Sequence, residues 1–277
     1  MQKDSQIPLV DIGVNLNSGQ YKGDLLEVFA RSMDAGVLGL IAIASDIEES
    51  VALQIFDQKS PIQIWRTAGV HPHLAKGCEP DWLTQLATLI QSSRCVALGE
   101  CGLDFYRNYS PKPVQLSVFQ SQAEMAFERR VPIYLHERAA HTELCQILER
   151  VYGQNEVRGV LHCFTGSTEE LRRYLDFGLY IGITGWVSDE RRGDSLRESV
   201  RYIPNDRLLF ETDGPYLRPR TYQGPIAGKR NEPALLRQIL HDVAVLRNVD
   251  PDQLAQTTLQ NTETLFQIAL RPASVSV

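Results

Sequence analysis

The chain has 277 residues, 43% of them apolar, and a formal net charge of −6 at pH 7. No run reaches the roughly 18 apolar residues that a membrane span needs, so we expect no membrane partner. The negative charge argues against broad adhesion to nucleic acid, although a local phosphate site remains compatible with it. The length and apolar content predict one α/β domain over residues 1–277.

Two further features bear on the compartment. The first residues, Met1–Gln6, lack the basic and apolar regions of a secretory signal. The five cysteines include no CxxC pair, which is typical of a reduced protein rather than a disulfide framework. We therefore expect a cytoplasmic protein, with a monomer as the favoured state.

In chain order, short apolar segments alternate with segments of helical periodicity, which is typical of βα units in a parallel sheet. The predicted strands are Leu9–Val14, Gly39–Ala44, Trp65–Val70, Cys95–Glu100, Pro132–His136, Gly159–His162, Tyr180–Thr184 and Leu208–Asp213. Eight such units in this length favour a (β/α)8 TIM barrel. The tail Asp250–Leu270 is predicted to be one extra helix, and a doubly wound open sheet is the alternative fold.

Four side chains of the metal-binding type each end a separate predicted strand: Glu100, His136, His162 and Asp213. The C-terminal ends of barrel strands open on one face, where active sites lie. Side chains alternate along a strand, so each of these residues points inward if its strand is regular. Imidazole and carboxylate ligands suit Zn, Mn or Fe, and a carboxylate site with waters also suits Mg. The pattern predicts a metal-dependent hydrolase.

The loops after the third and fourth strands carry further polar residues. For His71 and His73, metal ligation and contact with a substrate phosphate or bridging water both remain open. Asp104 is predicted to orient a ligand histidine or to activate water, and Arg107 to hold phosphate; loop capping is the alternative for both.

The segment Gly214–Asn231 directly follows Asp213 and has no acidic residue, but it contains Arg218, Arg220, Lys229 and Arg230. We expect it to contact phosphate, with a solvated loop as the alternative.

Aromatic residues near the strand ends are candidates for stacking a base, with core packing as the alternative. They are Phe105, Tyr106, Trp186 and Tyr216. Cys101 and Cys163 each follow a candidate ligand by one residue, so in a regular strand they point away from the site and pack.

Several motifs together resemble the TatD family of metal-dependent deoxyribonucleases, within the wider amidohydrolase-like barrels. They are Ala68-Gly-Val-His-Pro-His73, Ala97-Leu-Gly-Glu-Cys-Gly-Leu-Asp104, Leu135-His136 with Arg138, Gly159-Val-Leu-His-Cys-Phe-Thr-Gly166, Tyr180-Ile-Gly-Ile-Thr-Gly-Trp186, Glu211-Thr-Asp-Gly-Pro-Tyr-Leu217 and Arg230-Asn231-Glu232-Pro233. The resemblance covers nearly the whole chain. It implies a (β/α)8 barrel, a divalent metal and hydrolysis of DNA phosphodiesters, in several members as a 3′–5′ exonuclease.

Residue by residue, the resemblance implies Glu100, His136, His162 and Asp213 as metal ligands. We expect magnesium, with zinc or manganese as alternatives, and single-stranded DNA as substrate, with RNA as a further candidate. Asp213 or Glu100 is the predicted proton acceptor, and His71 is the third predicted catalytic residue. The predicted substrate-binding residues are His73, Asp104, Arg107, Arg138, Arg218 and Arg230.

Two positions depart from the family pattern. Most of the wider family has a His-x-His pair at the end of the first strand, where this chain has Gly13 and Asn15. The Gly-Val-Asn form resembles the TatD subgroup proper, so we interpret it as a variant site. Ala139 stands where an acidic residue is common.

Two other classes of function fit the same sequence. One is a hydrolase of a small amide, ester or lactone on the same barrel, although Glu100 stands where such enzymes end the fourth strand with a metal-bridging lysine. The other is a metal-binding scaffold without turnover.

Overall fold

The computed structural model describes residues 7–57, 60–226 and 228–271. Its strands form one eight-stranded parallel sheet in the order β1 to β8. The strands are β1 (Leu9–Val14), β2 (Val37–Ala42), β3 (Gln63–Ala68), β4 (Cys95–Asp104), β5 (Ile133–Arg138), β6 (Gly159–Leu161), β7 (Tyr180–Ile183) and β8 (Leu208–Phe210). The predicted barrel is confirmed, because each predicted strand is present and neighbours in sequence are neighbours in the sheet.

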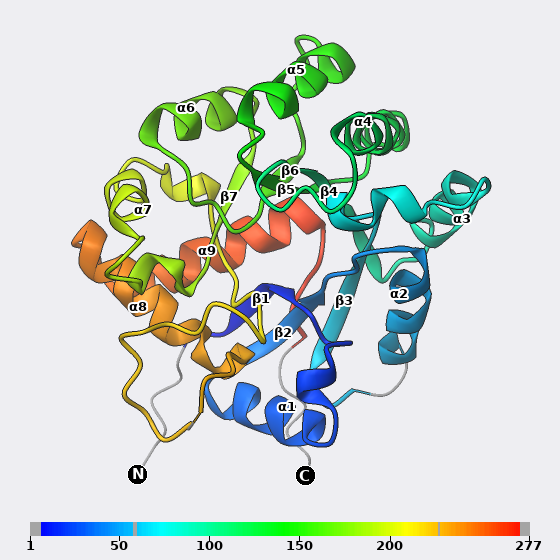
Figure 1. Ribbon diagram of the computed structural model, residues 1–277. Helices are drawn as coiled ribbons and strands as arrows, with labels where there is room; N and C mark the ends of the chain where they lie inside the picture. The colour runs from blue at the N-terminus through cyan, green and yellow to red at the C-terminus, as the bar shows by residue number, and fades with distance from the viewer. Residues whose placement is uncertain (1–6, 58–59, 227, 272–277) are drawn as a thin grey trace.

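All helices but the last surround the sheet as a ring, and the last one lies across the strands (Figure 1). The helices are α1 (Leu25–Asp34), α2 (Ile47–Ala52), α3 (Trp82–Leu89), α4 (Lys112–Arg129), α5 (His141–Tyr152), α6 (Thr168–Asp176), α7 (Asp194–Ser199), α8 (Leu236–Arg247) and α9 (Pro251–Phe266), with short 3-10 turns between some of them. The predicted terminal helix is α9. Among the described residues, no helix is long and apolar enough to cross a bilayer.

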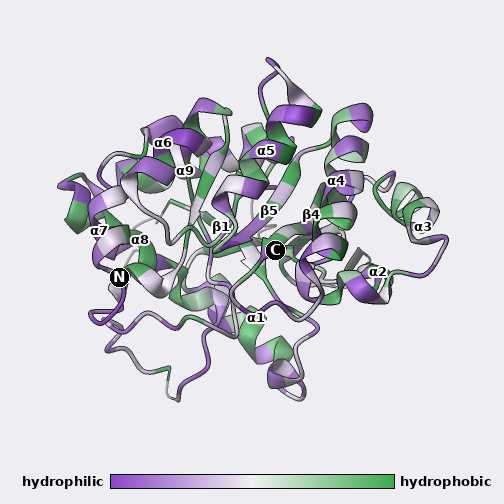
Figure 2. Ribbon diagram, turned by 45° about the horizontal axis from the view of Figure 1, so that its top comes forward, coloured by the Kyte–Doolittle hydropathy of each residue, from purple (hydrophilic) through white to green (hydrophobic). Residues whose placement is uncertain are grey.

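Two packed layers form the core. The larger one lies between the strands and the ring of helices, while a smaller cluster fills the barrel interior. Leu265 and Phe266 of α9 belong to that interior cluster together with Val10, Trp65 and Leu209. Helix α9 therefore covers one end of the barrel, where it contacts β1 and β8. In Figure 2 the strands lie within the ring of helices, and the helices carry both hydrophobic and hydrophilic residues.

The seam between β8 and β1 is closed by a few backbone contacts and by one side chain. The backbone contacts are the isolated bridge between Val14 and Gly214, the Asp213 N–H bond to Gly13 and the Asn15 N–H bond to Gly214. The buried carboxylate of Asp11 accepts the backbone N–H of Thr212 at 2.9 Å, the Thr212 hydroxyl and the N–H of Gly13. No regular ladder of backbone hydrogen bonds joins β1 to β8 among the described residues, so these bonds of Asp11 help to connect the first strand to the last.

The strands differ from prediction where the site begins. The β4–β5 register shifts between Gly99 and Cys101, so Glu100 lies at an irregularity rather than in regular alternation. Gly99 has φ +148°, and a side chain there would meet the carbonyl oxygen of Tyr134 at 2.3 Å. Asp213 lies beyond the end of β8 and has φ 53°. Simple alternation of strand side chains therefore does not orient these two residues.

Candidate metal centre and its cavity

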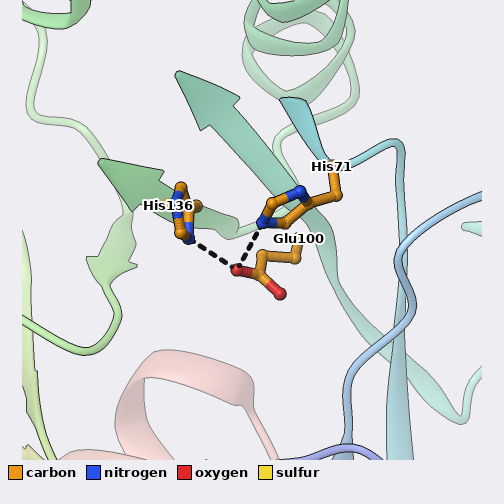
Figure 3. Close-up of side chains that lie close together, drawn as sticks. All are labelled: His71, Glu100 and His136. Carbon is orange, nitrogen blue, oxygen red and sulfur yellow. Dashed lines mark hydrogen bonds and ion pairs between the residues drawn. The ribbon is translucent and has the colours of Figure 1, made fainter. Parts of the chain in front are cut away.

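Glu100 is the hub of the site. Its Oε1 atom lies 2.9 Å from His136 Nδ1, 2.9 Å from His162 Nε2 and 3.4 Å from His71 Nε2. Figure 3 shows the carboxylate between His71 and His136. The carboxylate is buried, which by itself raises the pKa of Glu100, but the charge of His162, the nearby His71 and the hydrogen bonds from His136 and His162 together outweigh burial and hold that pKa well below its usual range. Glu100 therefore stays ionised.

His162 is oriented from below by Glu211. Glu211 is fully buried, and its Oε2 accepts the hydroxyl of Tyr134 at 2.6 Å and faces His162 Nδ1 at 3.2 Å. Its other oxygen accepts the backbone N–H of Cys163 at 2.5 Å. A carboxylate only accepts, so Nδ1 of His162 carries a proton, and Nε2 is the nitrogen left to ligate a cation when the ring is neutral.

His136 presents the opposite nitrogen to Glu100. Its Nδ1 faces the carboxylate, while its Nε2 is buried without a hydrogen-bond partner. Asp104 Oδ2 lies 3.5 Å from that Nε2, too far for a good hydrogen bond, and 2.7 Å from Nε2 of His73. Burial raises the pKa of Asp104, but the contacts with His136 and His73 outweigh it and lower the pKa. Asp104 thus pairs with His73 and lies next to His136, and its role in orienting a ligand histidine stays a prediction.

His71 differs from the other two imidazoles in its tautomer. Its Nδ1 accepts the backbone N–H of His73 at 3.0 Å, so the neutral ring carries its proton on Nε2, the atom that faces Glu100. Burial lowers the pKa of His71 to about 4, so the ring is neutral near pH 7. An Nε2–H group donates a hydrogen bond and does not ligate. Of the two roles left open for His71, this geometry favours contact with water or phosphate.

Asp213 lies beside this group and is held by Asn15. The Asn15 amide nitrogen donates to Asp213 Oδ1 at 3.1 Å and to the carbonyl of Gly214 at 3.2 Å. Burial raises the pKa of Asp213 to about 7. The residue that replaces the second histidine of the His-x-His pair therefore positions a predicted ligand.

The other replaced position, Gly13, is needed by the layer below. A side chain there would meet Glu211 Oε2 at 2.3 Å and the Tyr134 hydroxyl at 2.4 Å. The Tyr134–Glu211 pair thus fills the space beside Gly13, and a histidine could enter only by displacing that pair.

The donor set fits a divalent cation. Atoms of ligand type from Glu100, His136 and the neighbouring His71 all lie within 4.8 Å of one another, and His162 contacts the same carboxylate, so the centre is compact even though the tautomer of His71 does not suit ligation. Carboxylate oxygen with imidazole nitrogen is a donor combination for divalent metals. The carboxylates behind the rings, Asp104 and Glu211, supply the outer contacts that metal-binding histidines usually make.

The centre lies in a cavity of about 750 Å³. Glu100, His136, His162 and Asp213 all line it, and so do His71, His73, Asp104, Arg107 and Arg138. The guanidinium groups of Arg138 and Arg107 lie 4.3 and 5.9 Å from the ring centre of Tyr106. Neither arginine has a carboxylate partner among the described residues, so both cations are available to an anion.

The structure does not bring Arg218 and Arg230 to this cavity. Arg218 donates to the carbonyl oxygens of Arg230 and Ile226, which folds the loop on itself. Arg230 forms an ion pair with Asp24 at 2.6 Å. The absence of acidic residues within the segment Gly214–Asn231 was the signal for phosphate binding, but acidic partners come from elsewhere in the chain.

Other expectations divide in the same way. Trp186 and Tyr216 line the cavity, whereas Phe105 packs against the core. Cys101 is buried as predicted, but Cys163 lines the cavity. The prediction for Cys163 was wrong because the residue lies beyond β6 with φ 47°, where strand alternation has ended.

Sequence reasoning missed two charged residues of the cavity. Arg192 reaches the cavity from the loop after β7, and its position just beyond a predicted strand end was the available signal. Glu137 also lines the cavity and accepts the backbone N–H of Ala140 at 2.7 Å and the Tyr174 hydroxyl at 3.2 Å. The Glu137 carboxylate therefore fixes the turn after β5, which contains Ala139, by hydrogen bonds to Ala140 and Tyr174.

Comparisons with known proteins identify the family of the chain. The model of the family "TatD related DNase" matches residues 10–267. The "3'-5' ssDNA/RNA exonuclease TatD" of Citrobacter rodentium is 45% identical over 265 residues, 96% of this chain and 100% of the relative. A TatD homologue of Escherichia coli superposes with a TM-score of 0.83 at 26% identity, covering 94% of this chain and 98% of the other. A TatD family hydrolase from Entamoeba histolytica has the same fold, with a TM-score of 0.84, 24% identity and coverage of 94% and 98%. The chain therefore belongs to the family of TatD-related DNases.

Proposed function

We propose that this protein is a metal-dependent nuclease that hydrolyses phosphodiester bonds of DNA, acting as a 3′–5′ exonuclease on single strands, with RNA as a further substrate. The observation that carries the proposal is the pairing of two features in one cavity. A carboxylate–imidazole centre around Glu100 lies beside two arginines, Arg107 and Arg138, that have no carboxylate partner among the described residues. Relatives that match over their full length are named as exonucleases of single-stranded DNA and RNA.

We propose Glu100, His136, His162 and Asp213 as the residues that hold the metal. Magnesium is the ion we favour, with zinc and manganese as alternatives. When bound, a divalent cation supplies Lewis acidity and lowers the pKa of water.

The protein's own residues divide the remaining work. Asp213 is the proposed proton acceptor, since it lines the cavity while Glu100 is engaged by three imidazoles. The proposed role of His71, whose Nε2–H faces Glu100 at 3.4 Å, is to donate that N–H to a phosphate oxygen, and the neighbouring His73–Asp104 pair is proposed to contact the substrate as well. Arg107 and Arg138 are the proposed phosphate-binding cations, which neutralise charge that develops in the transition state.

The test follows release of nucleotides from single strands labelled at the 3′ or the 5′ end, with Mg²⁺, beside a panel of small esters, lactones and amides. We expect early loss of the 3′ label and no turnover of the panel. Glu100→Ala, His136→Ala and His162→Ala should each lower the rate by orders of magnitude, with unchanged circular dichroism, because the metal's charge is lost. Near-normal nuclease activity in all three variants would show that the assigned site is wrong.

We further propose a cytoplasmic monomer with one domain over residues 1–277. All five cysteines are free, which supports a reducing compartment. Light scattering would check the oligomeric state.

A further inference from the structure

One wall of the cavity is built from an arginine stacked on a tryptophan. Trp186 and Arg192 both line the cavity, and both come from the loop between β7 and α7. The guanidinium carbon of Arg192 lies 4.2 Å from the centre of the Trp186 ring. The indole N–H of Trp186 donates to the backbone carbonyl of Arg192 at 3.3 Å. The indole therefore contacts both the side chain and the backbone of Arg192.

Asp189 holds this arginine in place. Its Oδ2 accepts from Nε and Nη2 of Arg192 at 3.2 and 2.9 Å. The same carboxylate also binds Arg191, at 3.1 Å from Nε and 2.9 Å from Nη2. The Asp189 side chain is only 7% exposed, and its backbone carbonyl accepts from Gly193 at 2.7 Å and from Arg197 at 3.1 Å. The buried Asp189 therefore fixes the loop between β7 and α7 through both its side chain and its backbone carbonyl.

The Arg192 side chain nevertheless remains 53% exposed. The guanidinium carbon lies over the indole, and Nε and Nη2 are bound by Asp189, so the exposed part of the group is the side away from Trp186 and Asp189. Arg192 therefore presents a planar cation, fixed by an indole and a carboxylate, to the cavity that holds the candidate metal centre. Guanidinium planes and aromatic rings are the surfaces on which proteins stack unpaired bases.

We propose that the Trp186–Arg192 stack is a platform for an unpaired nucleobase next to the scissile phosphate. This inference rests on the proposed nuclease function and adds the feature of the substrate that the site recognises. The arginines of the cavity differ in how far their charge is neutralised, which suggests different roles for them. One Asp189 carboxylate already neutralises part of the Arg191–Arg192 pair, whereas Arg107 and Arg138 have no such partner and suit phosphate. Stacking requires an unpaired base and reads no hydrogen-bond pattern, so the platform favours single strands and tolerates any sequence.

Arg191 provides a matched control. It carries the same charge, binds the same carboxylate and has a similarly exposed side chain, 58%, but it does not line the cavity. The experiment compares Arg192→Ala, Arg192→Lys and Arg191→Ala with the wild type. Substrates are an intact oligonucleotide and two copies that carry an abasic site at the last or the penultimate 3′ position. KM for nucleotide release is measured, and Kd is measured separately by fluorescence anisotropy.

We expect Arg192→Ala to raise Kd and KM for the intact strand by about tenfold, the size typical of one lost stacking contact. Arg192→Lys should give an intermediate loss because it keeps the charge without the plane. The loss should disappear for one of the two abasic strands, and Arg191→Ala should match the wild type throughout.

Two results would overturn the platform: an Arg192→Ala effect of equal size on intact and both abasic strands, or an effect of Arg191→Ala as large as that of Arg192→Ala. Either would mean that Arg192 contributes charge alone. If the wild type released no nucleotide from any strand, the proposed function would fail instead, and the anisotropy comparison would still decide the stacking question.

Discussion

Glu211 shows how a single buried residue prepares the metal centre. It fixes the proton of His162 on Nδ1, accepts from Tyr134 and Cys163, and occupies the space that Gly13 leaves open. Glu211 itself does not line the cavity, although His162 and Cys163, which it contacts, do. Its proposed role is therefore positioning rather than catalysis.

The prediction at this scale is that Glu211→Gln weakens metal binding about 10- to 100-fold, the usual cost of losing an outer contact to a ligand histidine. The amide has a single acceptor oxygen, so it cannot serve both Cys163 N–H and the Tyr134–His162 pair. Calorimetric titration of Mg²⁺ or Mn²⁺ into the protein measures the effect. Tyr134→Phe is the control, because it leaves the contact with His162 intact and should cost less. Equal affinity in Glu211→Gln and the wild type would exclude the positioning role.

Among the elements, the contact between β1 and β8 is the one whose stability depends most on a single side chain. Asp11 supplies acceptors to backbone N–H groups of both Gly13 and Thr212. Beyond this carboxylate, the seam has the bridge between Val14 and Gly214, the Asp213 N–H bond to Gly13 and the Asn15 N–H bond to Gly214.

We predict that Asp11→Ala lowers the free energy of unfolding by about 2 to 4 kcal/mol, because it leaves two buried donors without an acceptor. Asp11→Asn keeps one oxygen and should cost less. Denaturant unfolding of the three proteins at pH 7 measures the difference. A loss in Asp11→Ala no larger than that of a surface substitution would show that the seam does not depend on this carboxylate.

The difference in stability between the wild type and Asp11→Asn should also depend on pH. Burial raises the pKa of Asp11 from 3.8 to about 7, so the folded carboxyl holds its proton at pH values where the unfolded one has lost it. The stability of the wild type relative to Asp11→Asn should therefore fall as pH rises from about 4 to about 7 and change little above that. A flat difference across this range would contradict the raised pKa.

For the whole molecule, the question is how a protein of net charge −6 binds a polyanion. Many of its arginines are engaged by its own carboxylates, as Arg230 is by Asp24 and Arg220 is by Glu190. Arg107 and Arg138 stand out at the cavity because they are not.

Replacing Arg107 and Arg138 with Ala should therefore weaken binding of single-stranded DNA and reduce the slope of log affinity against log salt by about 1.4, or 0.7 for each phosphate contact. The control is Arg129→Ala with Arg172→Ala, which removes the same charge from exposed positions of α4 and α6 away from the cavity. Anisotropy titrations at several salt concentrations give both slopes. If the control lowers the slope as much, the binding reflects net charge rather than these two residues.

The sequence by itself predicted the barrel and the residues around the centre. Hydrophobic periodicity repeats in eight units, and the C-terminal ends of parallel strands must share one face, so Glu100, His136, His162 and Asp213 had to converge. The alternation of strands and helices and the terminal helix could also be predicted from the sequence, because both depend on residues close to one another in the chain.

The tertiary structure decided what depends on partners distant in sequence. Arg230 meets Asp24 across 206 residues, and Asp11 meets Thr212 across 201, so neither contact is visible in a local pattern. The tautomers of His71 and His162, the space above Gly13 and the arrival of Arg192 at the cavity depend on the same kind of contact. A side chain's type follows from the sequence, but whether its charge or lone pair is free depends on what the fold brings beside it.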